Sequence, residues 1–119
     1  MVKITLLGEP RSTGSIYKSR ILGKFSSTYM THEGKELKES YQWQAKAQYR
    51  NTPLSGELKV NMKLYFGTKR KSDIDNFNKL CFDALTGVVW EDDSQVYDFH
   101  ITKTYDKERP RIELEVEHL

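Results

Sequence analysis

Two pairs of aspartates are the residues of this chain whose type and spacing suggest chemistry. Asp73 and Asp75 stand two positions apart, and residues i and i+2 of an extended backbone point to the same side. Asp92 and Asp93 lie in a second acidic turn, which could meet the first pair if the chain folds back. Three converging carboxylates repel one another unless a cation neutralises them. Hard oxygen ligands suit Mg²⁺, which activates water and stabilises charge on a phosphodiester.

Basic residues stand directly before the first acidic pair, at Lys69, Arg70 and Lys71. Such a run binds a phosphate backbone by displacing counterions, and Arg11 and Lys18 in an earlier basic segment extend the same surface. A lone run of three basic residues is more typical of a solvated turn, and a lone D-x-D is common. It is the adjacency of the two runs that favours a nucleic-acid cleavage site.

Lys79 is open to two interpretations. It lies four residues after Asp75 and four before Asp83, on the polar face of a predicted helix. This spacing favours two surface ion pairs, each worth about 0.3–0.5 kcal/mol. The alternative is an electrostatic partner of the scissile phosphate or of its transition state.

The elements that must position these residues follow from the hydrophobic periodicity. Alternation predicts strands at 2–7, 57–66, 95–103 and 111–117, and helical stripes predict helices at 35–50 and 75–87. Asp75 is expected to cap the second helix and Gly87 to end it. Residues 9–31 show no stable period and are predicted to be a long, partly mobile basic loop. The order predicts one small α+β domain over 1–119, a mixed or antiparallel sheet with two main helices.

Composition narrows the classes of protein to which this chain could belong. The chain has 119 residues and a net charge of +2. Its single cysteine, Cys81, stands among apolar neighbours, so we expect it in the core and expect no disulfide within the chain. No signal peptide, membrane span, Gly-rich phosphate loop or Ser-His-Asp spacing is visible, and the histidines lack metal-ligand spacing. We therefore expect a cytoplasmic protein with no membrane partner.

Three ordered sequence blocks resemble the RusA family of Holliday junction resolvases. The blocks read "DIDNFNK" (73–79), "FDAL" (82–85) and "WEDDSQV" (90–96). The close resemblance covers about a quarter of the chain and extends loosely to the rest. It implies a RusA-like fold and a small homodimeric, Mg²⁺-dependent endonuclease, often encoded by prophages. Such enzymes act in DNA recombination and repair, making paired symmetric nicks in four-way junction DNA.

The resemblance also assigns roles to residues. The family's metal-binding aspartates match Asp73, Asp75 and Asp93, and its functional lysine matches Lys79. This match favours a functional role for Lys79, whereas spacing alone favours surface ion pairs. Asp92 remains the alternative third ligand, since a slip of one residue is possible in this turn. Asp83 also matches a family position, where we expect a structural role.

Two other functions remain open. One is a DNA-binding protein of the same fold without catalysis, against which the intact acidic set argues. The other is an endonuclease that acts on flaps or replication forks. Neither the preferred cut sequence nor the choice between Mg²⁺ and Mn²⁺ follows from the sequence.

Overall fold

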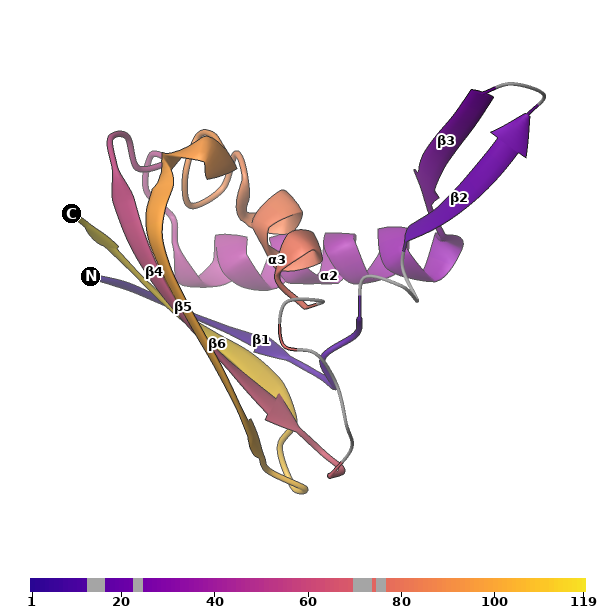
Figure 1. Ribbon diagram of the computed structural model, residues 1–119. Helices are drawn as coiled ribbons and strands as arrows, with labels where there is room; N and C mark the ends of the chain where they lie inside the picture. Colours follow the sequence, from indigo (N-terminus) through magenta and orange to yellow (C-terminus); the bar gives the residue numbers. More distant parts are fainter. Residues whose placement is uncertain (13–16, 23–24, 70–73, 75–76) are drawn as a thin grey trace.

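A mixed four-stranded sheet forms the centre of the protein, seen here in a computed structural model (Figure 1). The structure describes residues 1–12, 17–22, 25–69, 74 and 77–119, and for 17–22 and 25–28 it describes the backbone alone. The elements along the chain are β1 (Val2–Leu7), β2 (Tyr17–Leu22), β3 (Phe25–Met30), α2 (His32–Gln48), β4 (Leu58–Phe66), α3 (Asn78–Leu85), the short 3₁₀ helix η2 (Asp93–Gln95), β5 (Val96–Tyr105) and β6 (Arg111–His118). This order confirms the predicted α+β class.

The strand order in the sheet is β1–β6–β4–β5. β6 runs antiparallel to both β1 and β4, whereas β5 runs parallel to β4. A parallel pair needs a long crossover, and the segment containing α3 supplies it. The register aligns Ile4, Leu114 and Met62 in one row across β1, β6 and β4. All three are at most 2 % exposed, so the alternation read from the sequence marks the buried face.

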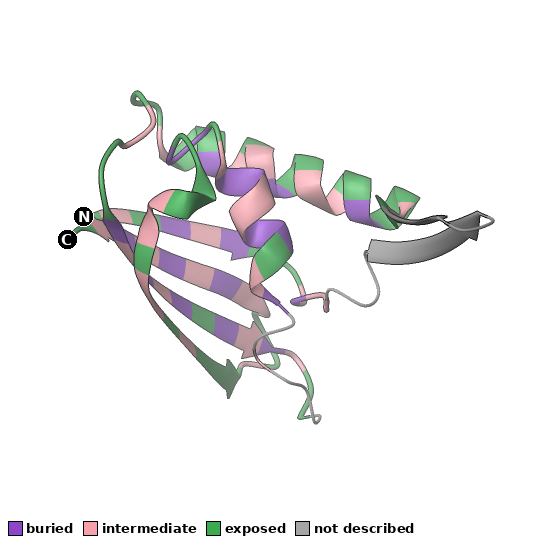
Figure 2. Cartoon of the chain, turned by 45° about the horizontal axis from the view of Figure 1, so that its top comes forward, coloured by how far each residue is buried: buried purple, intermediate pink, exposed green. Residues whose placement is uncertain are grey.

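Both helices cover this same face of the sheet (Figures 1 and 2). The core joins Tyr41 and Ala45 of α2 to Leu80, Cys81 and Ala84 of α3. Burial raises the pKa of the Cys81 thiol to about 12, so the thiol stays protonated at neutral pH. The prediction that this cysteine is a core residue is confirmed.

The prediction of a long loop over 9–31 is wrong. β2 and β3 pair as an antiparallel hairpin, with Tyr17 opposite Met30 and Leu22 opposite Phe25. The hairpin projects away from the sheet, beyond the end of α2 where that helix begins (Figure 1). Hydrogen bonding between the two segments defines these strands, and neither segment carries a clear apolar alternation of its own.

The helix starts also differ from prediction. α2 begins three residues early, because Thr31 caps it through a hydrogen bond from the Gly34 amide at 3.1 Å. α3 begins at Asn78 with Phe77 as its N-cap, so the expectation that Asp75 caps it is wrong. Phe77 is 3 % exposed and its ring packs edge-on against Phe66 at 5.1 Å. This tertiary contact, rather than a capping side chain, marks where α3 starts.

Side chains of α2 cover the outer edge of β1. Gln48 accepts from the Thr5 amide and donates to its carbonyl, both at 2.7 Å, while Gln44 accepts from the Leu7 amide. These bonds satisfy backbone groups that an edge strand otherwise leaves open for pairing. None of the helices in the described part of the chain has the length and apolarity that crossing a bilayer requires.

Candidate active site and DNA-facing edge

The acidic turn at 91–93 is held by a compact set of hydrogen bonds. Asp92 caps η2, accepting from the Ser94 amide at 3.2 Å, and Gln95 completes a capping box by accepting from the Asp92 amide at 2.8 Å. The Gln95 amide group also donates to the carbonyls of Leu54 and Gly56, which anchors the turn to the chain before β4. The Asp92 carboxylate therefore has a structural task that Asp93 does not share.

Asp93 lies beside the polar face of α3. Although Asp93 is exposed, partial loss of hydration raises the pKa of its carboxyl, and a hydrogen bond with Asp92 raises it further. The charges of Asp92 and Asp83 also raise this pKa, while Lys79 lowers it. Tertiary folding thus brings the turn into electrostatic contact with two residues of the helix.

Lys79 and Asp83 form the ion pair that the sequence spacing predicts. The Lys79 Nζ lies 3.5 Å from Asp83 Oδ2, and the lysine side chain remains 55 % exposed. This ion pair leaves the ammonium group accessible to a ligand at the surface. Its positive charge also lowers the pKa of Asp93, so the acidic turn lies within electrostatic range of this lysine.

Four predicted site residues, Arg70, Lys71, Asp73 and Asp75, fall outside the described residues, as does the side chain of Lys18. Among the described residues alone, no three of His, Cys, Asp or Glu form a group that could hold a metal ion. The donor set nevertheless suits a divalent cation. The negative charges of Asp92 and Asp83 raise the pKa of the Asp93 carboxyl, and a bound cation would offset this repulsion.

Both ends of the segment that contains these residues lie at one place in the fold. Phe66 ends β4, Phe77 precedes α3, and their rings are in contact. Phe66 and Phe77, which flank residues 67–76, therefore lie together at the same end of the sheet. Lys69, at the start of this segment, places its Nζ 5.7 Å from the centre of the Tyr105 ring.

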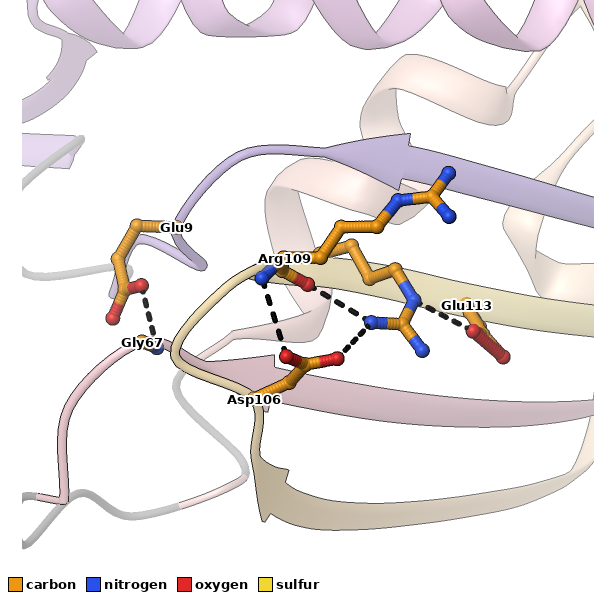
Figure 3. Close-up of polar contacts among 6 residues, drawn as sticks. Glu9, Gly67, Asp106, Arg109 and Glu113 are labelled. Atoms are coloured by element: carbon orange, nitrogen blue, oxygen red, sulfur yellow. Dashed lines mark hydrogen bonds and ion pairs between the residues drawn. The ribbon is translucent and has the colours of Figure 1, made fainter.

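Three turns meet where this segment begins (Figure 3). The Glu9 carboxylate accepts a 2.8 Å hydrogen bond from the Gly67 amide, and the Gly8 amide donates to the Pro110 carbonyl at 3.1 Å. A Cβ at position 67 would lie 2.9 Å from the Glu9 carboxylate and 3.0 Å from the Pro110 ring, so any side chain here would force a neighbour to shift. No pattern along the sequence predicted this role of Glu9, although the glycine that follows strand 57–66 was an available signal.

Two arginines, Arg111 and Arg11, are engaged in ion pairs. Arg111 bonds Asp106 and Glu113, each at 2.8 Å, and stacks over the Tyr65 ring at 3.6 Å. Arg11, a predicted phosphate contact, lies 3.0 Å from Glu33 near the start of α2. An approaching phosphate would have to compete with Glu33 for this guanidinium.

Comparison with known proteins identifies the family of the chain. The sequence profile of the family described as endodeoxyribonuclease RusA matches residues 8–117. The chain belongs to the RusA family of endodeoxyribonucleases.

Two curated RusA relatives, from Enterobacteria phage 82 and Escherichia coli K12, are named crossover junction endodeoxyribonuclease RusA. Each is 29 % identical to the chain over 90 residues, which is 75 % of either protein. A further relative, the uncharacterized protein YqaN of Bacillus subtilis, is 27 % identical over 138 residues, covering 95 % of this chain and 93 % of YqaN. The predicted resemblance to the RusA family is confirmed.

Proposed function

We propose that this RusA-family protein is a Mg²⁺-dependent endonuclease that resolves four-way DNA junctions by paired symmetric nicks. The observation that best supports the proposal is the position of Asp93 beside Lys79 and Asp83. This electrostatic coupling links residues from all three sequence blocks, 73–79, 82–85 and 90–96. The names of the curated RusA relatives indicate the crossover junction as substrate.

Asp73, Asp75 and Asp93 are the residues that would hold the metal ion. When bound, Mg²⁺ supplies a Lewis acid that lowers the pKa of water and offsets charge on the phosphate. Lys79, with its exposed ammonium group facing the acidic turn, binds a phosphate oxygen and stabilises the charge that develops there. Asp83 holds that lysine in place from one helical turn away.

The basic residues position the DNA strand. Lys69, Arg70 and Lys71 precede the acidic pair, so a phosphate backbone bound by them passes the carboxylates. A homodimer matches the substrate, because a four-way junction has near two-fold symmetry and resolution needs two equivalent cuts. One active site per subunit then cleaves each of two opposed strands.

Cleavage of a synthetic four-way junction tests this proposal. Wild type should cut the junction in Mg²⁺ and should stop cutting when a chelator removes the metal. Asp75→Asn should not cut. It should bind the junction more tightly than wild type, because it places less negative charge near the phosphates. Asp98→Asn is a matched control: it makes the same change at a partly exposed strand position, where Asp98 pairs with His100. Equal cutting by Asp75→Asn and wild type would refute the catalytic assignment.

The same assay separates the alternatives. Tight junction binding without cutting by wild type would indicate a non-catalytic DNA-binding protein, and preference for flaps or forks would indicate the other endonuclease. Asp93→Asn should abolish cutting. Asp92→Asn should preserve it, since asparagine caps a helix as well as aspartate does. The reverse result would make Asp92 the third ligand.

A further inference from the structure

A hollow at the carboxyl ends of β4 and β5 lies next to the segment that carries the predicted site. Its volume is about 290 Å³. The residues that line it come from the ends of both strands and from the start of the 67–76 segment: Phe66, Thr68, Lys69, Lys103, Thr104 and Tyr105. Because β4 and β5 are parallel, both strands end at this edge, away from the two helices (Figure 1).

The strand register explains how two β5 residues reach this hollow. Lys103 pairs with Leu64 and Tyr105 pairs with Phe66, so both follow the buried face of β4. The helices do not extend over this end of the sheet, and the last four residues of β5 are exposed (Figure 2). Lys103 and Tyr105 thus lie on the side of the sheet that carries α3, at positions that would belong to the core if a helix covered them.

The charged side chains among the described residues that line the hollow are all basic. Its titratable side chains are those of Lys69, Lys103 and Tyr105, and no acidic residue is among the described residues that line it. The Tyr105 ring lies under the Lys69 ammonium group at 5.7 Å, a cation–π contact that orients the lysine. The ammonium groups of Lys69 and Lys103 and the hydroxyl of Thr68 are donors of the kind that bind phosphate oxygens.

The opposite face of the sheet carries acidic as well as basic residues. There Lys59 lies opposite Glu117 and Lys63 lies opposite Glu113 across the β4–β6 pair. Carboxylates are thus interspersed with the lysines on that face, so it offers a polyanion less net attraction than an all-basic surface would.

We propose that Lys69, Lys103 and Tyr105 form a binding site for the DNA backbone, which extends the DNA-facing surface from the catalytic segment onto the end of β5. This inference rests on the proposed function, because it takes the DNA strand as the occupant. Lys103 and Lys69 contact phosphate oxygens, and Tyr105 keeps Lys69 in position. The strand that passes the aspartates therefore continues across the hollow.

Binding of a labelled four-way junction, measured by fluorescence anisotropy in Ca²⁺ over a range of salt concentrations, tests the site. Lys103→Gln should weaken binding roughly three- to tenfold near 0.1 M salt and lower the log–log salt slope by about 0.9. Lys63→Gln is the matched control: the same charge is removed from an exposed lysine on the opposite face, one residue from the partner of Lys103. It should bind like wild type.

Tyr105 is tested by two substitutions. Tyr105→Phe keeps the ring and should retain binding, whereas Tyr105→Leu should weaken it, and thermal melting of each variant checks that folding is intact. Equal affinities and salt slopes for Lys103→Gln and Lys63→Gln would overturn this site while leaving the proposed function standing. Failure of wild type to bind the junction would overturn both.

Discussion

Gly67→Ala probes the junction where β4 passes into the segment that carries the predicted site. The added Cβ would lie 2.9 Å from Glu9 Oε2 and 3.0 Å from Pro110 Cγ, so at least one neighbour must move. The Glu9 carboxylate is the more mobile of the two, and its displacement breaks the 2.8 Å bond from the Gly67 amide. We therefore expect a loss of stability that arises from one identified hydrogen bond.

The size of this loss follows from two opposing terms. A hydrogen bond to a charged group contributes about 1.5–3 kcal/mol. The alanine recovers roughly 0.4–1 kcal/mol, because it restricts the unfolded chain. The free energy of unfolding should therefore fall by about 1–2 kcal/mol, which lowers the melting temperature by roughly 3–12 °C for a domain of this size.

A double-mutant cycle in urea measures the interaction itself. Glu9→Gln should lower the free energy of unfolding by less than Gly67→Ala, because the amide oxygen still accepts the bond without the charge. The double variant should lose less than the sum of the two single losses, since both changes act on the same contact. Additive losses, or wild-type stability of Gly67→Ala, would show that this contact does not hold the turns together.

Two further predictions concern stability. Trp90→Ala should lower the free energy of unfolding in urea by about 3–5 kcal/mol, because this indole is fully buried and its N–H donates to the Thr86 hydroxyl. Trp43 is 73 % exposed, so Trp43→Ala should change the free energy of unfolding by less than about 0.5 kcal/mol. Arg111 lowers the pKa of Asp106, so this carboxylate stabilises the fold above the unfolded pKa of about 3.9 and loses that effect as the pH falls through the folded pKa. Between pH 7 and pH 3, the free energy of unfolding should fall by less for Asp106→Asn than for wild type. Identical pH dependences of the two proteins would contradict this.

Local patterns in the sequence determined much of this protein. Strands β4 and β6 could be predicted because burial on one face of a sheet imposes an alternation with period two, and α2 because burial on one helix face imposes a stripe. The three blocks between 73 and 96 identified the family, because they record residue types and spacing directly. The ion pair between Lys79 and Asp83 also followed from spacing within one helix.

Contacts between distant segments decided the rest. The β2–β3 hairpin depends on pairing between strands, and the start of α3 depends on Phe77 packing against Phe66, which outweighs any capping preference. The parallel register of β4 and β5 brings Lys103 and Tyr105 beside Lys69, a proximity that no periodicity along one segment reports. Local sequence constrains backbone conformation and burial, whereas side chains from separate elements meet only once the sheet has fixed their relative positions.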